Sequence, residues 1–154
     1  MNCGWAERLA ALALALAGLA APLPAQQVRE IGVQAIATAA DPATGVLGVS
    51  GALRTSSRAR VAAFLGAGIA GDRGIWRGEL VGHFLLNPAA RGRPGLYGGG
   101  GIAVVGSRKT RGYAVLLLGI EGNPGGSSGW NFEAGVGGGV RLSVGYRWRS
   151  IPSL

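Results

Sequence analysis

Bulky apolar residues alternate with small or charged residues along most of the chain, most clearly near its end. In WNFEAGVGGGVRLSVGYRWR (residues 130–149), one parity carries mainly apolar and aromatic side chains and the other carries glycine, polar or charged ones. Side chains of a β-strand point alternately to opposite faces of a sheet. The stretch therefore predicts a strand, a turn or bend at the glycines 137–139, and a second strand.

The same alternation recurs upstream at the regular spacing expected of an all-β fold. The further candidate strands cover residues 30–39, 46–55, 58–70, 75–86, 96–107 and 111–122. Because 111–122 is apolar on both faces at its centre, a short helix is an alternative there. The chain has eight strands if 137–139 form a turn, and seven if these glycines only bend one long strand.

A sheet with one apolar face needs either a second layer or closure on itself. The candidate strands are close to the ~9–11 residues of a tilted transmembrane strand. Charged residues make up 14% of the chain, against about 25% in an average soluble domain. We therefore predict an up-and-down antiparallel closed β-barrel, with apolar residues facing lipid and with charges and glycines filling the interior.

The polar face of the predicted strands carries charges of both signs. An eight-stranded barrel is just wide enough for side chains to fill it, and buried charges are tolerated when they are paired. Together with Glu30, the polar-face residues predict a salt-bridged plug in preference to an ion path. The predicted interior charge network comprises Arg77, Glu79, His83, Glu121, Glu133, Arg141 and Arg147.

Four aromatic residues lie towards the ends of predicted strands. They are Trp76, Trp130, Tyr146 and Trp148. Membrane barrels carry girdles of aromatic side chains at the two lipid–water interfaces. We therefore predict these four residues to be interfacial.

The N-terminus has the form of an export signal. An apolar run at 9–21 follows Arg8 and precedes a proline-containing segment that ends at the small residue Ala25. This pattern predicts a signal peptide over 1–25, a barrel domain over 26–149 and a C-terminal tail over 150–154. Cys3, the only cysteine, lies in the predicted signal, so no cysteine metal site or disulfide is expected in the exported chain.

The net charge of +8 is compatible with an anionic partner, and equally with solvated charge on the loops and barrel rims that has no specific partner. Because the basic residues are spread along the chain and export is predicted, outer-membrane lipid or lipopolysaccharide is favoured over nucleic acid. No metal site and no cofactor are expected, since the chain has one histidine and no mature cysteine.

Three functions are compatible with the pattern. The first is a non-enzymatic outer-membrane barrel with a structural or surface-interaction role. The second is a soluble periplasmic barrel that binds a small apolar ligand inside. The third is a lipid-modifying barrel enzyme that uses His83 with a polar-face serine such as Ser50 or Ser143. The first is favoured over the second, because charges of both signs on the polar face and aromatic residues at strand ends fit a membrane barrel. It is favoured over the third, because nothing in the sequence brings those serines to His83.

The signal peptide, the alternating strands over 26–149 and the closing VRLSVGYRW resemble the small eight-stranded outer-membrane β-barrel family of Gram-negative bacteria. The resemblance implies an outer-membrane location and recognition of the aromatic-rich last strand by the outer-membrane assembly machinery. If both termini are periplasmic, the outer connections are 41–45, 71–74, 107–111 and 137–139. All are short, which argues against a role as adhesin or receptor. The oligomeric state stays open.

Overall fold

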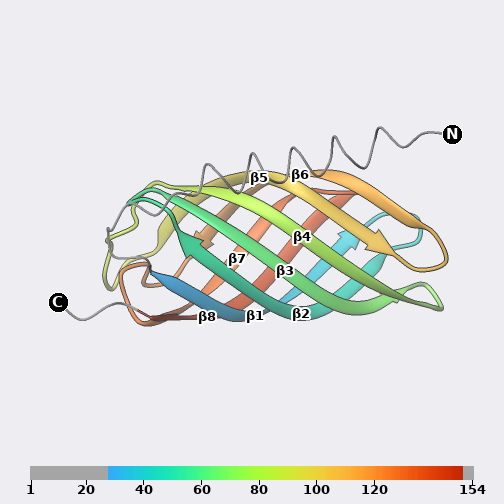
Figure 1. Cartoon of the computed structure of the whole chain (residues 1–154), viewed down its shortest axis with the longest axis horizontal. Coiled ribbons are helices and arrows are strands. Elements are labelled where there is room, and N and C mark those ends of the chain that lie inside the picture. Colours follow the sequence, from blue (N-terminus) through green and yellow to red (C-terminus); the bar gives the residue numbers. More distant parts are fainter. Residues whose placement is uncertain (1–27, 151–154) are drawn as a thin grey trace, which may run out of the picture.

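Residues 28–150, which the computed structural model describes, form a closed barrel of eight antiparallel strands (Figure 1). Each strand pairs with its sequence neighbours, and β1 closes the barrel on β8. The strands are β1 (Arg29–Ala39), β2 (Thr44–Arg54), β3 (Ala59–Ala70), β4 (Arg73–Leu85), β5 (Gly95–Gly106), β6 (Thr110–Glu121), β7 (Ser128–Val136) and β8 (Val140–Ser150). The predicted all-β, up-and-down closed barrel is confirmed. The predicted signal peptide and residues 151–154 of the predicted tail lie outside the described residues.

The sequence left open whether residues 137–139 form a turn or a bend and whether 111–122 is a strand or a helix. The structure has eight strands. Gly138 and Gly139 have φ angles of +84° and +149°, values that glycine adopts far more readily than other residues. The glycines 137–139 are therefore a turn between β7 and β8. Residues 110–121 are a strand that pairs on both sides. Within residues 28–150, no helix has the length and apolarity needed to cross a membrane.

The outer wall of the barrel is apolar. Leu118, Leu47 and Ile31 expose 74%, 68% and 65% of their surface, and large apolar side chains from all eight strands lie on the same outer face. The buried polar and charged side chains lie at the alternating positions. The polarity of the barrel is thus the reverse of that of a soluble protein, in which apolar side chains are buried.

The lumen also contains apolar residues. One buried cluster comprises Val81, Leu85, Tyr97, Ala103, Val115 and Leu117, and the other comprises Ile36, Val46, Phe64 and Ile75. The expectation that charges and glycines fill the interior was therefore incomplete. Since buried charge is stable only where a partner can be placed, uncharged side chains fill the rest of the lumen.

The strands are staggered around the barrel. The row of cross-strand neighbours that starts at Trp76 on β4 ends at Leu86, the residue directly after β4, ten residues further along the chain. The row passes through Ala67, Leu47, Ala35, Val144, Phe132, Ile120 and Leu96. Such a stagger requires tilted strands. A row of neighbours on the outer wall therefore runs obliquely from one end of the barrel towards the other.

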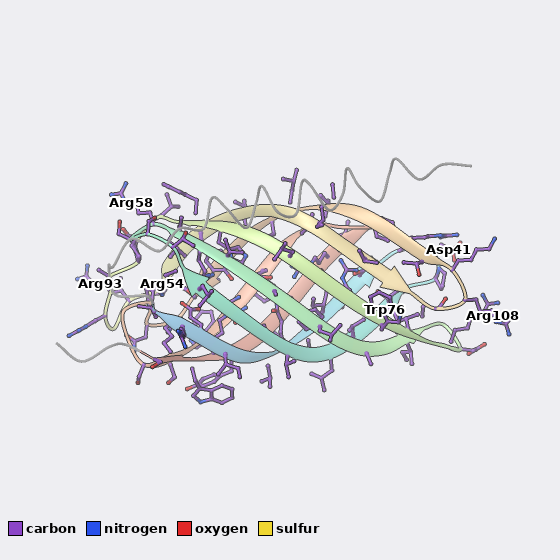
Figure 2. All side chains as sticks on the ribbon, in the orientation of Figure 1. Asp41, Arg54, Arg58, Trp76, Arg93 and Arg108 are labelled. Carbon is purple, nitrogen blue, oxygen red and sulfur yellow. The ribbon has the colours of Figure 1, made fainter. Side chains whose placement is uncertain are left out.

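The two ends of the barrel differ in their connections. The hairpin rim is formed by residues 40–43, 71–72, 107–109 and 137–139, and the terminus rim by 55–58, 86–94 and 122–127 together with both ends of the described chain (Figure 1). Figure 2 labels Asp41, Trp76 and Arg108 at the hairpin rim, and Arg54, Arg58 and Arg93 at the terminus rim. The longest connection, 86–94, belongs to the terminus rim.

The Tyr97 side chain of β5 packs inside the barrel over the neighbouring strand β6. Its ring lies over Gly119, so that a Cβ atom at Gly119 would collide with the ring. The ring cannot move aside easily, because Arg60 lies 4.8 Å from its centroid and the His83 ring packs edge-on at 5.1 Å. Gly119 therefore provides the space that the aromatic ring occupies.

We expect Gly119→Val to destabilise the barrel by about 1–3 kcal/mol, because the added side chain overpacks a filled interior. Gly112→Val on the same strand is the matched control, since the nearest atom to a Cβ there is 4.0 Å away. Urea unfolding midpoints of both variants in detergent micelles provide the comparison. Equal midpoints for the two variants would contradict the proposed packing.

Candidate functional site

The residues predicted for the interior charge network all lie in the lumen. Arg77, Glu79 and His83 come from β4, Glu121 from β6, Glu133 from β7, and Arg141 and Arg147 from β8. None of them exposes more than 7% of its surface. Glu30 on β1 is buried in the same lumen. Residues far apart in sequence are thus brought together by closure of the sheet.

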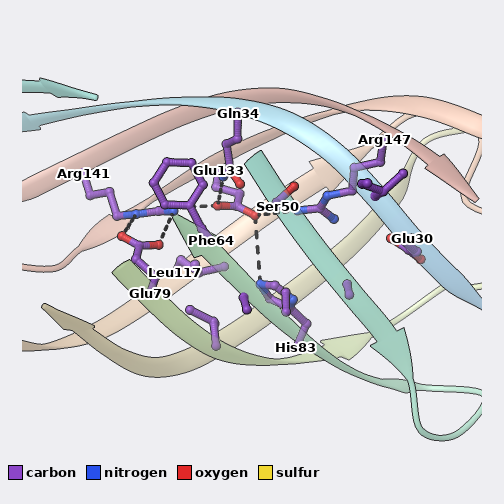
Figure 3. A pocket seen from close by; sticks show the side chains of 15 residues that line it. Glu30, Gln34, Ser50, Phe64, Glu79, His83, Leu117, Glu133, Arg141 and Arg147 are labelled. Atoms are coloured by element: carbon purple, nitrogen blue, oxygen red, sulfur yellow. Dashed lines mark hydrogen bonds and ion pairs between the residues drawn. The ribbon is translucent and has the colours of Figure 1, made fainter. Parts of the chain in front are cut away.

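Glu133 is the centre of the network. Its Oε2 accepts hydrogen bonds from Ser143 Oγ at 2.8 Å, Gln34 Nε2 at 3.0 Å and Arg141 Nη1 at 3.0 Å. Its Oε1 accepts from Tyr97 Oη at 2.9 Å and Arg147 Nη2 at 3.2 Å. Figure 3 shows this carboxylate between Arg141 and Arg147. Donors from three strands other than its own, β1, β5 and β8, therefore converge on one side chain.

A second carboxylate lies nearer the hairpin rim. Glu79 accepts from Arg141 Nη2 at 2.9 Å and from Arg77 Nε at 2.6 Å. Arg77 also donates to the Gly137 carbonyl at 3.0 Å and to Thr38 Oγ1 at 3.4 Å. Arg141 thus links Glu79 to Glu133, while Arg77 ties the network to the β7–β8 turn.

The remaining pair of carboxylates lies nearer the terminus rim. Glu121 accepts from Arg60 Nη1 at 2.8 Å and from Arg149 Nη2 at 3.2 Å. Glu30 accepts from Arg54 Nε at 2.9 Å and from Arg60 Nη1 at 3.3 Å. Arg60 therefore bridges the two carboxylates. Charge-assisted contacts of this kind are the stronger protein hydrogen bonds.

Sequence reasoning omitted several members of the network. Gln34, Arg54, Arg60 and Arg149 stand at the parity of the polar face of their strands, so including every charged or amide residue of that face would have found them. Tyr97 gave a weaker signal, because it stands beside a run of glycines. Its role depends on Glu133 and Arg60, which only the folded sheet brings to it.

Little free space remains among the side chains around Glu133. A cavity of about 20 Å³, lined in part by Gln34, Ser50, Phe64, His83 and Glu133, lies within the network (Figure 3). This volume suffices for about one water molecule, whereas pockets for small organic ligands measure roughly 300–1,000 Å³. The charges of the network therefore do not surround a ligand-sized chamber.

His83 has no catalytic arrangement within residues 28–150. Its Nδ1 accepts a hydrogen bond from Arg60 Nε at 3.3 Å, and its Nε2 lies 4.0 Å from Glu133 Oε1. Ser143 donates to Glu133, and Ser50 lines the small cavity, but no hydrogen bond joins His83 to a serine in this part of the chain. The described residues also contain no cluster of side chains that could hold a metal ion.

The four aromatic residues predicted to be interfacial all point outwards, with 39–49% of their surface exposed. Trp130, Tyr146 and Trp148 lie on β7 and β8 towards the terminus rim, and Trp76 lies on β4 towards the hairpin rim. Tyr146 and Trp148 pack edge to face at 5.2 Å, and Tyr146 Oη donates to Ser128 Oγ at 2.9 Å. Aromatic side chains therefore lie near both ends of the apolar wall.

We expect Glu133→Leu to destabilise the barrel by about 3–5 kcal/mol, because Arg141 and Arg147 lose a buried partner. Glu133→Gln should cost less, since an amide oxygen still accepts hydrogen bonds. Asp72→Asn at the exposed hairpin rim is the control and should change stability by less than about 0.5 kcal/mol. Unfolding midpoints in detergent rank the variants, and a Glu133→Leu midpoint equal to that of the control would contradict the buried network.

No protein-family model and no curated protein sequence matches this chain. Among solved structures, the N-terminal β-barrel domain of Pseudomonas aeruginosa OprF is similar, with a TM-score of 0.61 and 11% sequence identity. The similarity covers 79% of this chain and 97% of that domain. At this level of identity, the comparison establishes a shared barrel fold.

Proposed function

We propose that this chain is a non-enzymatic integral outer-membrane β-barrel protein with a structural or surface-interaction role. The observation that carries the proposal is the reversed polarity of the wall, with leucine, isoleucine and valine outside and paired arginine and glutamate inside. Contiguous exposed apolar surface of this extent is unfavourable in water and favourable in lipid. A closed barrel also satisfies all backbone hydrogen bonds at membrane depth.

The proposed orientation places the terminus rim in the periplasm and the hairpin rim at the cell surface. It is supported by the predicted signal peptide over 1–25, which would deliver the N-terminus of the exported chain to the periplasm. The outer-membrane assembly machinery is the proposed partner during insertion. The aromatic-rich β8, with Tyr146 and Trp148 on its outer face, is the proposed recognition element.

The alternatives fit the geometry less well. A soluble periplasmic barrel that binds an apolar ligand requires an apolar, ligand-sized interior. Here the cavity within the charge network measures about 20 Å³, and the larger space at the hairpin-rim mouth is lined by arginine and lysine side chains. A lipid-modifying enzyme requires lipid to reach the nucleophile, whereas His83 is 5% exposed and enclosed by Arg60, Tyr97 and Glu133.

We expect Leu116→Arg to impair membrane insertion by about 2–4 kcal/mol, because it places a charge on the lipid-facing wall near mid-depth. Thr110→Arg adds the same charge at the hairpin rim and should insert like the parent. The measurement is the fraction of protein in the washed outer membrane, with heat-dependent gel mobility as the test of folding. If the parent protein is soluble without detergent, or if Leu116→Arg inserts normally, the proposed function fails.

The mostly plugged interior predicts a barrel that does not conduct ions steadily. Planar bilayers containing the purified protein should remain at baseline current, because Arg141, Glu79 and Glu133 fill the cross-section with paired side chains. The same preparation must show the folded gel mobility. A sustained open level from folded protein would contradict the plug.

A further inference from the structure

A hollow lies on the outer wall beside the hairpin rim. It has a volume of about 630 Å³ and is lined by Ala67, Gly68, Trp76, Gly106, Arg73 and Arg108, among others. The Trp76 ring lies across Gly106, where a Cβ atom would collide with it. The hollow is therefore bordered by an aromatic ring and by small residues, with two guanidinium groups at its rim side.

The two arginines are exposed, and neither forms an ion pair with a carboxylate within residues 28–150. They also line the mouth of the barrel, a space of about 760 Å³, together with Lys109, Arg111 and Asp41. Asp72 is the other acidic residue of this rim. Positive charge thus exceeds negative charge where the apolar wall meets water.

A second hollow of about 570 Å³ continues the first along the wall, since both include Ala67 and Gly68. It is lined mainly by apolar or small residues, among them Ala35, Leu47 and Phe132. Ala67, Leu47, Ala35 and Phe132 belong to the oblique row of neighbours that starts at Trp76. The joined trough therefore leads from the basic rim down into the lipid-facing wall.

We propose that this trough binds one phosphate-bearing lipid of the outer leaflet, with its phosphate on Arg73 and Arg108 and an acyl chain along the wall beside Ala67. The proposal rests on the proposed membrane location. Guanidinium groups bind phosphate through paired, charge-assisted hydrogen bonds. Only an amphipathic ligand makes favourable contacts with both parts of the trough. A free anion would bind the arginines alone, and a neutral lipid would contact the apolar part alone.

The terminus rim provides a matched comparison. Arg58, Arg91 and Arg93 line a hollow of about 700 Å³ there, together with connection residues such as Ser57 and Asn87. That hollow shares no residue with the apolar trough. It carries similar charge without the continuous path for an acyl chain, so it separates lipid recognition from general attraction between a basic rim and an anion.

The test uses diphosphoryl lipid A as the probe, added to the purified protein in detergent, with bound lipid counted by native mass spectrometry. Arg73→Gln/Arg108→Gln should weaken binding about tenfold or more, from the loss of two charge-assisted contacts. Arg58→Gln/Arg93→Gln should change it less than twofold. Ala67→Trp, which fills the trough, should weaken lipid binding, and Ala63→Trp on the same exposed face of β3 should not.

Folded gel mobility and outer-membrane insertion are measured on every variant, so a failure of the proposed membrane location is seen separately. The proposal is overturned if folded, inserted Arg73→Gln/Arg108→Gln binds like the parent, or if the two arginine pairs weaken binding equally. Inorganic phosphate is the second probe. If it displaces lipid A at millimolar concentration while Ala67→Trp has no effect, the site binds the anion alone and the lipid assignment is wrong.

Discussion

Closure of β1 onto β8 is the constraint on which the rest of this structure depends. It pairs the two strands along their length, from Arg29 opposite Ser150 to Ala39 opposite Val140, and so leaves no unpaired edge between the first and last strands. Closure also determines the environment of each face of the sheet. One face encloses a lumen only wide enough for side chains, and the other becomes the whole outer surface.

The charged lumen follows from that geometry. Glu133 on β7 meets Gln34 on β1, Tyr97 on β5 and Arg141 on β8 only when the sheet is a cylinder. Each of these side chains is buried in the lumen, so an unmatched charge there would be costly. The pairing of arginines with glutamates therefore joins strands across the lumen as well as filling part of the interior.

The alternation of residues was sufficient to predict the closed barrel, the strand positions within about two residues, and the outward or inward direction of most side chains. It was not sufficient for the partners within the lumen. Arg60 bridges Glu30 and Glu121, three residues on three strands, and this contact depends on the stagger of the sheet. Tyr97 was missed for a related reason, since a run of glycines follows it in the sequence and its space is provided by Gly119 on the adjacent strand. The turn at 137–139 could not be distinguished from a bend by pattern alone, because both place glycine at the same positions.

The depth of the tryptophans in lipid tests the reversed polarity most directly. In protein that begins at Gln26, the only tryptophans are Trp76, Trp130 and Trp148, all on the outer wall towards the rims. Their fluorescence is measured after reconstitution into vesicles whose lipids carry bromine at graded depths. If these tryptophans form an aromatic girdle on a lipid-facing wall, brominated lipid should quench their fluorescence strongly. The quenching should be greatest when the bromine lies near the head groups. Fluorescence unaffected by brominated lipid at every depth would place these side chains away from the bilayer and contradict the membrane barrel.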